Sequence, residues 1–398
     1  MRILLVAGGT GGHINPALAV AGKFKEELQD DAEILFIGTP DHMETKLVPA
    51  AGYRFKGIEV YGFARKKTVR AFIHNIGALG KILSSSLKAR WTIRKFDPDV
   101  AIGFGGYVSG PIIMEACKLH VPTAIHEQNA FPGIANRLLA KHVDQVLLTS
   151  EDAATRLKCK NKPIVTGLPV RQELIDADKS TCRKELGIKD DELLILSMGG
   201  SLGAEPINRA VAALMAGKKD DKKIKFLHGT GGGMLSAMKE YMEEEGLNLD
   251  ETPNIEIREY INDMNRCMAA ADIVIGRAGA SSLYEIRATG KASILIPSPY
   301  VTENHQYYNA LELADSGAAY LIEEKDLTGE LLKEKTDSLL YNDEKRHEFE
   351  QKAKEMAITD SADRIVACLK DISRKPDERR RKTWTADRLK NRLGKRKP

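Results

Sequence analysis

Two glycine-rich segments could bind an anionic group of a ligand. One is "GGTGGH" (residues 8–13) and the other is "GGSLGA" (199–204), and each joins an apolar run to an amphipathic stretch. Glycines at such a strand-to-helix junction let the backbone approach a ligand and present N–H groups at the positive end of the helix dipole. His13 adds a side chain that titrates near neutral pH. The pattern predicts two anion sites, with His13 as a candidate general base.

Neither segment has the spacing of a common nucleotide-binding loop. A P-loop needs a lysine after its last glycine, and the dinucleotide pattern G-x-G-x-x-G, counted from Gly9, ends at Ile14 instead of at a glycine. The sequence therefore supports neither a P-loop ATPase nor an NAD enzyme, although it does support a generic anion site.

Polar and aromatic residues follow several other apolar runs. The segments are "GFGGYVSGP" (103–111), "HEQNAFPGIAN" (126–136), "GRAGASSLYE" (276–285) and "HQYYNA" (305–310). Four consecutive polar residues directly after an apolar run, as in "HEQN", suggest contact with a hydroxyl-rich ligand. We interpret the glycines at 231–233 as a flexible turn, because glycine supplies the backbone angles that turns require.

The elements that must position these segments alternate between short apolar runs and amphipathic stretches, which is typical of strand–helix units around parallel sheets. The expected strands are 3–7, 33–37, 100–103, 123–126 and 145–148, then 193–198, 224–228, 255–258, 273–275 and 293–296. Asn15 and Pro16 suit the N-cap and first residue of the helix after the first glycine segment, and Pro206 takes the same place after the second.

Gly167 and Pro169 mark a domain boundary. Each half opens with a strand, a glycine segment and a helix, so the fold class is α/β, with two similar doubly wound parallel-sheet domains. Ligands of such sheets bind at the carboxyl ends of the strands. The expected division is 1–165 for the first domain, 166–345 for the second, a C-terminal helix at about 346–372 that packs back on the first domain, and a tail at 373–398.

Composition places the chain among globular proteins of a reducing compartment. It has 398 residues, 42% hydrophobic and 29% charged, and its five cysteines are far apart with no C-x-x-C pair. That spacing fits neither a disulfide framework nor a zinc site. The N-terminus lacks the long apolar core of a signal peptide, and no stretch approaches the ~18 apolar residues of a membrane span. We expect the protein to stay in the cytosol unless it attaches to a surface.

Basic charge is concentrated in two places. Residues 374–398 hold twelve Lys/Arg against three Asp/Glu, a net +9, so the rest of the chain carries −5. Residues 63–96 contain nine Lys/Arg and no acid, together with an apolar stripe at helical spacing: Phe72, Ile76, Leu79, Leu83, Leu87 and Trp91. An apolar stripe flanked by bases suits a helix at an anionic membrane surface. The same stripe also suits a helix that docks on the sheet, and both can hold.

Six of these motifs, in this order and at about this spacing, resemble the MurG family of UDP-GlcNAc:lipid I N-acetylglucosaminyltransferases. They are "GGTGGH", "GGYVSGP", "HEQNAFPG", "GGSLGA", "GRAGASSLYE" and "HQYYNA", and the resemblance runs from residue 1 to about 370. It implies the GT-B fold, in which two Rossmann-like domains enclose a cleft. It also implies inverting transfer of GlcNAc from UDP-GlcNAc to lipid I, at the cytoplasmic face of the membrane, which builds the second sugar of the peptidoglycan precursor.

The resemblance implies roles for particular residues. Arg171 and Ser201 would contact the diphosphate, Glu285 the ribose and Ile261, through its backbone, the uracil. The other substrate-binding residues that it implies are Thr10, Gly11, Gly12, Tyr107, Asn129, Ala280 and Gln306. In two places the sequence departs from the pattern: His305 precedes Gln306 where some relatives have a second glutamine, and Leu202 stands where a polar residue is common.

The reaction needs a base for the acceptor hydroxyl, and two residues are candidates. His13 is the first, with a helix-start residue that contacts phosphate or backbone as the alternative interpretation. Glu127 is the second. No D-x-D-like element follows a strand, and the resemblance implies no metal site, so no cofactor and no nucleic-acid partner are expected.

Three other functions remain open on this fold. The first is another GT-B lipid glycosyltransferase, against which "GGYVSGP" together with "HEQN" argues. The second is a UDP-GlcNAc 2-epimerase, which would not need the basic stripe. The third is a non-catalytic nucleotide-sugar-binding scaffold, which would be expected to lack His13 or Glu285. Proteins of cell-wall synthesis are further expected partners.

Overall fold

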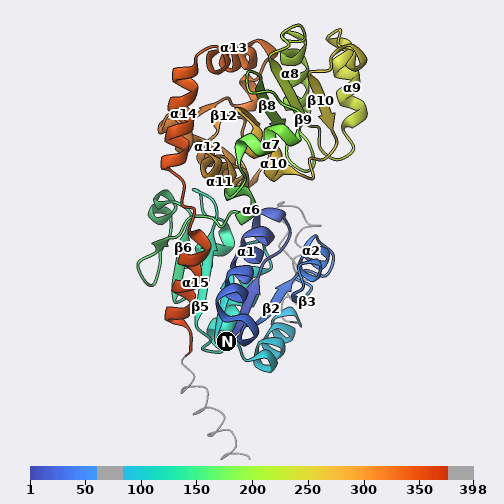
Figure 1. Ribbon diagram of the computed structural model, residues 1–398. Coiled ribbons are helices and arrows are strands. Elements are labelled where there is room, and N and C mark those ends of the chain that lie inside the picture. Colours follow the sequence, from blue (N-terminus) through green and yellow to red (C-terminus); the bar gives the residue numbers. More distant parts are fainter. Residues whose placement is uncertain (61–83, 375–398) are drawn as a thin grey trace, which may run out of the picture. The chain divides into compact units, whose positions relative to one another are not determined.

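The computed structural model describes residues 1–60 and 84–374, which form two compact units (Figure 1). The first unit comprises the described residues of Met1–Glu127 and Pro132–Thr166 and those from Ala362 onward. The second comprises Gly167–Ser361 and a short segment, Gln128–Phe131, that belongs to it by its contacts.

The first unit is built on a seven-stranded sheet in the order β3-β2-β1-β4-β5-β6-β7, and every strand pairs in parallel. Its strands are β1 (Arg2–Val6), β2 (Glu33–Gly38), β3 (Arg54–Gly57), β4 (Val100–Gly103), β5 (Thr123–Glu127), β6 (Gln145–Leu148) and β7 (Ile164–Val165). The five expected strands are confirmed within two residues. The two edge strands, β3 and β7, were not expected.

Helices cover both faces of this sheet because successive strand residues alternate between two apolar layers. Ile3 and Leu5 of β1 join α1 and α15 in one core, whereas Leu4 and Val6 join the helical residues 84–96, α4 and α5 in the other. The helices with named bounds are α1 (Gly11–Leu28), α2 (Glu44–Ala50), α4 (Ser109–Lys118), α5 (Ile134–Leu139) and α15 (Ser361–Ile372), with single 3₁₀ segments at Gln29–Asp31 and Glu151–Arg156.

The second unit repeats this plan with six parallel strands in the order β10-β9-β8-β11-β12-β13. Its strands are β8 (Leu193–Met198), β9 (Ile224–Gly229), β10 (Ile255–Arg258), β11 (Ile273–Gly276), β12 (Ala292–Leu295) and β13 (Ala319–Leu321). All five expected strands are present, and again an edge strand, β13, was not expected. The fold class of two doubly wound parallel-sheet domains is therefore confirmed.

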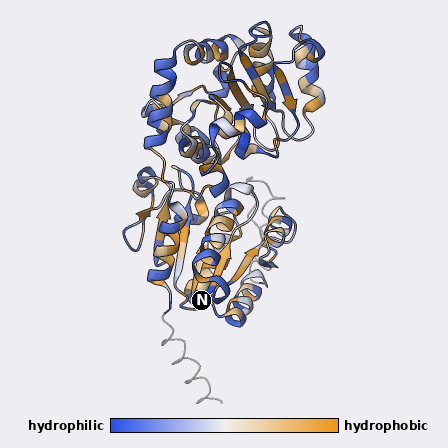
Figure 2. Cartoon of the chain, in the orientation of Figure 1, coloured by the Kyte–Doolittle hydropathy of each residue, from blue (hydrophilic) through white to orange (hydrophobic). Residues whose placement is uncertain are grey.

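Two helical layers enclose the second sheet, and Figure 2 shows the hydrophobic residues gathered on the strands and on the helix faces against them. One layer is α8 (Glu205–Ala216), α9 (Leu235–Glu244), α13 (Gly329–Leu340) and α14 (Asp343–Glu355). The other is α6 (Gln172–Ile175), α7 (Lys179–Glu185), α10 (Met264–Ala270), α11 (Ala280–Thr289) and α12 (His305–Asp315). The 3₁₀ segments are Leu249–Glu251, Thr302–Asn304 and Glu324–Asp326.

Several expected details differ. The N-cap of α1 is Thr10 rather than Asn15, and Pro16 lies inside the helix. The glycine-rich Gly11–Gly12 already forms the first helical turn, so the helix begins one turn earlier than capping preferences suggest. Where one helix was expected over 346–372, two are present, because the chain leaves helical geometry between α14 and α15.

Part of the basic and apolar pattern lies outside the described residues. This applies to residues 61–83, with Phe72, Ile76, Leu79 and Leu83, and to the tail beyond Arg374. Among the described residues, no helix has the length and apolar character needed to cross a membrane.

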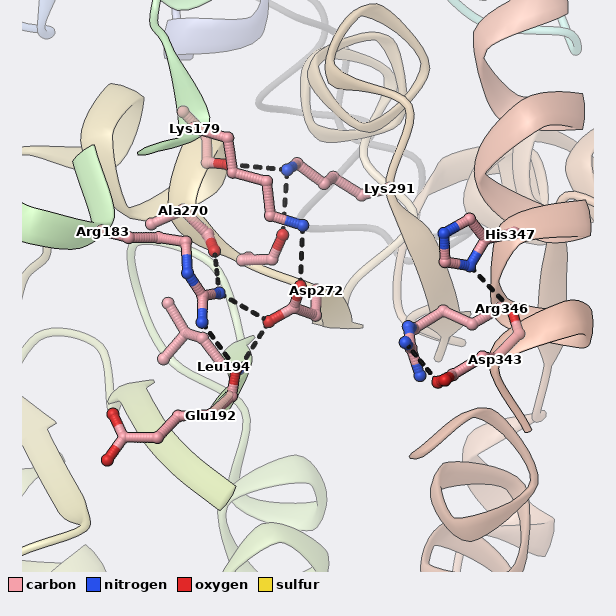
Figure 3. A network of polar contacts seen from close by, with 12 residues as sticks. Lys179, Arg183, Glu192, Leu194, Ala270, Asp272, Lys291, Asp343, Arg346 and His347 are labelled. Carbon is pink, nitrogen blue, oxygen red and sulfur yellow. Dashed lines mark hydrogen bonds and ion pairs between the residues drawn. The ribbon is translucent and has the colours of Figure 1, made fainter. Parts of the chain in front are cut away.

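Charged side chains form a hydrogen-bonded network at the amino-terminal ends of the strands of the second sheet (Figure 3). Asp272, just before β11, accepts hydrogen bonds from Lys179 Nζ at 2.7 Å, from Arg183 at 2.9 Å and from the Leu194 N–H at 2.7 Å. Burial alone would raise the pKa of Asp272, but these partners lower it. Lys291 Nζ donates to two carbonyls at the end of α10, and burial lowers its pKa to about 8. The network occupies the amino-terminal ends of the strands, so the candidate site is expected at their carboxyl ends.

Candidate active site

Most of the candidate residues follow strands of a parallel sheet, so within each unit they gather at the carboxyl ends of the strands. In the first unit they follow β1 and β4, and Glu127 ends β5. In the second unit they follow β8, β10, β11 and β12. Asn129 and Arg171 follow β5 and β7 in the chain, although both belong to the second unit by their contacts.

A buried carboxylate organises the first glycine segment. Glu44, at the start of α2, is fully buried; its Oε1 accepts from Thr39 N at 2.9 Å and from Thr39 Oγ1 at 2.6 Å, and its Oε2 accepts from Gly9 N at 3.2 Å. Burial alone would raise the pKa of Glu44, but the hydrogen bonds lower it. A Cβ on Gly8 would lie 2.6 Å from Glu44 Oε1. Only a glycine fits at position 8 beside this carboxylate. The hydrogen bond from Gly9 N to the carboxylate in turn fixes the loop that leads to His13.

The two glycine segments of the first unit also touch each other. Gly106 has φ +77°, and a Cβ there would lie 2.4 Å from the carbonyl oxygen of Gly8. The next residue, Tyr107, is 44% exposed, and its hydroxyl lies 3.1 Å from Nε2 of His42. Burial raises the pKa of the Tyr107 hydroxyl. Tyr107 thus lies at the carboxyl ends of the strands, as residues 8–12 do.

The two candidate bases have different surroundings. His13 is the third residue of α1 and is half-buried, three positions after the exposed Thr10. Glu127 ends β5 and is only 1% exposed; its Oε2 accepts from Gly133 N at 3.0 Å and from Asn136 Nδ2 at 2.8 Å. The Glu127 carboxylate thus helps to fix the start of α5.

Arg171 and Glu285 are brought together in the second unit. The Arg171 guanidinium lies 3.6 Å from Glu285 Oε1, and the two side chains are 42% and 20% exposed. Burial raises the pKa of Glu285, and the attraction of Arg171 opposes that shift only in part. Ala280 opens α11 one turn before Glu285, and the N-cap, Gly279, makes no side-chain cap hydrogen bond. The start of this helix therefore presents backbone N–H groups beside an arginine and a carboxylate.

Helix α12 holds the segment that carries Asn129. Asn309 is 4% exposed; its Oδ1 accepts from Ala130 N at 2.9 Å, and its Nδ2 donates to Asn129 Oδ1 at 3.2 Å. Phe131 stacks on Tyr308, with ring centroids 5.4 Å apart. Sequence reasoning did not identify Asn309, although it lies inside the motif "HQYYNA".

Gln306, also on α12, is oriented by the loop before it. Its Oε1 accepts from the Ser298 N–H at 2.9 Å. This contact fixes the orientation of the Gln306 amide.

Ser201 and Ile261 lie on neighbouring loops of the second unit. Ser201 is exposed in the loop after β8, next to the 83% exposed Leu202. The side chain of Ile261 packs towards Gly229, where a Cβ would lie 3.1 Å from Cδ1 of Ile261. Since that side chain points to the protein, the backbone of Ile261 is the part left for a ligand.

The candidate residues thus form two sets, one in each unit. Those of the first unit are Thr10, Gly11, Gly12, His13, Tyr107 and Glu127, and those of the second are Asn129, Arg171, Ser201, Ile261, Ala280, Glu285 and Gln306. Across residues 1–60 and 84–374, no group of three or more His, Cys, Asp or Glu side chains could hold a metal ion.

Known proteins match this chain over nearly its whole length. Residues 3–148 match the glycosyltransferase family 28 N-terminal domain, and residues 194–365 match the family 28 C-terminal domain. The chain is 41% identical over 372 residues to the UDP-N-acetylglucosamine--N-acetylmuramyl-(pentapeptide) pyrophosphoryl-undecaprenol N-acetylglucosamine transferase of Acetivibrio thermocellus, covering 94% of this chain and 98% of that protein. It is 43% identical over 373 residues to the enzyme of the same name from Caldanaerobacter subterraneus, covering 94% and 100%.

The fold is also that of a solved relative. The crystal structure of MurG from Acinetobacter baumannii superposes with a TM-score of 0.74 at 27% sequence identity, over 93% of this chain and 99% of that one. With both family domains matched in order and relatives above 40% identity along nearly the whole length, the chain belongs to glycosyltransferase family 28.

Proposed function

We propose that this enzyme transfers N-acetylglucosamine from UDP-GlcNAc to the muramyl sugar of lipid I, forming lipid II for peptidoglycan synthesis. The observation that carries the proposal is the 41% identity to a transferase of that name over 94% of the chain. The candidate residues add chemical support, because an arginine, a carboxylate and helix-start N–H groups meet in one unit, as a nucleoside diphosphate requires.

In the proposed reaction, the acceptor hydroxyl of the muramyl sugar attacks the anomeric carbon of GlcNAc on the face opposite to UDP. The new glycosidic C–O bond forms while the bond to the diphosphate oxygen breaks, so the configuration inverts and UDP carries away the bonding electrons. Arg171 and Ser201 stabilise the charge that develops on the diphosphate. His13 accepts the hydroxyl proton. Glu127 suits a positioning role better, since its Oε2 already accepts two hydrogen bonds from its own unit.

The direct test is incubation with labelled UDP-GlcNAc and a lipid I analogue. Transfer of label to the analogue, with one UDP released for each sugar transferred, is the expected result. Formation of UDP-ManNAc without an acceptor would identify an epimerase instead. Transfer to diacylglycerol but not to the analogue would identify another lipid glycosyltransferase, and binding without turnover would identify a scaffold.

Replacing Glu285 by alanine is expected to weaken UDP-GlcNAc binding by about 1–3 kcal/mol, because a charged hydrogen bond to the ribose is lost. Isothermal calorimetry with UDP measures this change. Glu244→Ala is the matched control, because it also removes a partner of an arginine, Arg209 at 3.1 Å, but Glu244 is the last residue of α9 and belongs to none of the loops that carry candidate residues. Equal UDP affinity of wild type and Glu285→Ala would remove Glu285 from the donor site.

We also propose that the enzyme works at the cytoplasmic face of the membrane as a peripheral protein, bound through residues 63–96 and assisted by the basic tail 374–398. Cell-wall synthesis proteins are the further partners we propose there. Support comes from residues 84–96, where Ala89, Ile93 and Phe96 face the core while Leu87 and Trp91 are 60% and 62% exposed. Lys88, Arg94 and Lys95 are exposed on the same helix, and Lys95 Nζ lies 5.0 Å from the centre of the Trp91 ring.

The double variant Leu87→Ser/Trp91→Ser is expected to bind anionic vesicles about tenfold more weakly, because two exposed apolar side chains no longer enter the interface. Sedimentation with vesicles at low salt measures the binding. Tyr300→Ser, which removes an 87% exposed aromatic from the second unit, should bind like the wild type. If the double variant binds vesicles as tightly as Tyr300→Ser does, this helix is not the membrane contact.

A further inference from the structure

The loop between β9 and α9, Thr230–Met234, is named here the triglycine loop. Its backbone N–H groups connect it to two neighbouring loops of the second unit: Gly232 N donates to the carbonyl oxygen of Ser201 at 3.0 Å, and Gly231 N donates to that of Glu259 at 3.1 Å. Gly233 N donates to the Glu259 side chain at 2.7 Å. The loop therefore joins the glycine segment that carries Ser201 to the chain that leads to Ile261.

Two glycines from different loops interlock at this junction. Gly203 has φ +74°, and a Cβ there would lie 2.3 Å from the carbonyl oxygen of Thr230; Gly231 has φ +87°, and a Cβ there would lie 2.0 Å from Gly203 N. The nearest atom that each Cβ would meet belongs to the backbone, so it cannot turn away as a side-chain end can. The segment 231–233 is a turn, as expected, but close contacts require its glycines, beyond what turn geometry alone asks of them.

A third contact involves the residue before Ile261. A Cβ on Gly232 would lie 2.3 Å from the hydroxyl oxygen of Tyr260. This contact differs from the previous one, because Tyr260 is 51% exposed and its hydroxyl can be removed by substitution.

A series of hydrogen bonds between fully buried polar side chains holds the start of the triglycine loop. His228, near the end of β9, has its Nδ1 2.8 Å from Ser197 Oγ of β8 and its Nε2 3.1 Å from Asn208 Oδ1 of α8. Because an amide oxygen only accepts, Nε2 carries the hydrogen and Nδ1 accepts from the serine hydroxyl. Asn208 Nδ2 in turn donates to the carbonyl oxygen of Thr230 at 3.1 Å. The start of the triglycine loop is therefore fixed relative to β8 and α8.

We propose that the triglycine loop is a positioning element of the donor site, with Gly231 as its central positioning residue. It holds Ser201 and the backbone of Ile261 at a fixed separation, so that the diphosphate and uracil contacts are formed before UDP-GlcNAc arrives. Such preorganisation favours binding, because the ligand does not have to order these loops. The inference rests on the proposed function for the assignment of Ser201 and Ile261 to the donor.

Two alanine variants separate steric contact from backbone strain. Gly231→Ala and Gly233→Ala both place a side chain at positive φ, +87° and +73°, but only Gly231 has backbone atoms within 4 Å of the added Cβ. We expect Gly231→Ala to raise the KM for UDP-GlcNAc at least about tenfold above that of Gly233→Ala, as overpacking of a fixed contact does. The kcat at saturating donor and the KM for the lipid I analogue should change little in both variants. Equal donor KM values in the two variants would overturn the inference.

A rescue experiment keeps the test valid if Gly231→Ala does not fold. Gly232→Ala should raise the donor KM, and adding Tyr260→Phe should restore it towards the wild-type value, since the clashing hydroxyl is gone. Failure of the second substitution to restore the donor KM would contradict the proposed contact. Calorimetric titration of the same variants with UDP distinguishes the two levels of inference: wild-type enzyme that does not bind UDP refutes the proposed function, whereas UDP binding that is equal in all variants refutes only the role of the loop.

Discussion

Replacing His13 by alanine is expected to lower kcat by about 10²–10⁴, the range for losing a general base. The third residue of α1 follows the 8–12 loop, which Glu44 and the contact between Gly8 and Gly106 hold in place. Removing the imidazole removes the group that accepts the hydroxyl proton, so the loss should fall on kcat. Steady-state kinetics with the lipid I analogue measure the change.

Donor affinity serves as the internal control for that experiment. His13→Ala should bind UDP almost as tightly as the wild type, and Glu127→Gln should lower kcat less than His13→Ala does. If UDP affinity collapses in His13→Ala while kcat at saturating donor survives, His13 is a binding residue at a helix start. If Glu127→Gln has the larger effect on kcat, Glu127 is the base.

The central strands could be predicted from the sequence because each is a short apolar run buried on both faces. The edge strands β3, β7 and β13 could not, whereas the edge strand β10 could. Residues 54–57 read Arg-Phe-Lys-Gly, and β7 has only two residues, so neither gives an apolar run. Their strand geometry comes from pairing with β2 and β6, which are distant in the sequence.

The candidate residues were proposed from motifs, whereas the residues that hold them came to light only in the structure. Glu44 lies in a polar stretch that matches no motif, and its partners are Thr39 and a glycine 35 positions earlier. Asn309 reaches a segment 179 residues away. A sequence pattern reports local spacing, so contacts that depend on two distant loops meeting at a sheet edge leave no signal in it.

The start of α1 shows a related limit. Capping preferences favoured Asn15 and Pro16, but the helix begins at Gly11 and Thr10 makes no side-chain cap hydrogen bond. We attribute this to the segment before the helix, where Gly8 lies against Glu44 and Gly106, because tertiary contacts can outweigh intrinsic preference. The helix start with poor local capping is the one that carries the proposed base.

The free energy of unfolding is expected to fall by about 3 kcal/mol between pH 6.5 and pH 4 through His228 alone, following the difference between its pKa values in the two states. Complete burial lowers the pKa of His228 from 6.5 to about 4. The unfolded chain therefore binds a proton in this window that the folded chain does not, so stability decreases as the pH falls through it. Above pH 6.5 the contribution of His228 is constant, because the ring is neutral in both states.

Urea unfolding of His228→Gln at pH 7 and at pH 4 measures this contribution. The variant should be less stable at pH 7, because the polar chain from Ser197 to Asn208 is disturbed, but it should lose about 3 kcal/mol less than the wild type on acidification. His347→Gln removes an exposed histidine of α14 in the same unit and controls for the loss of one imidazole. Should His228→Gln and His347→Gln lose the same stability between the two pH values, the neutral, buried His228 would not be the source of the predicted loss of stability in acid.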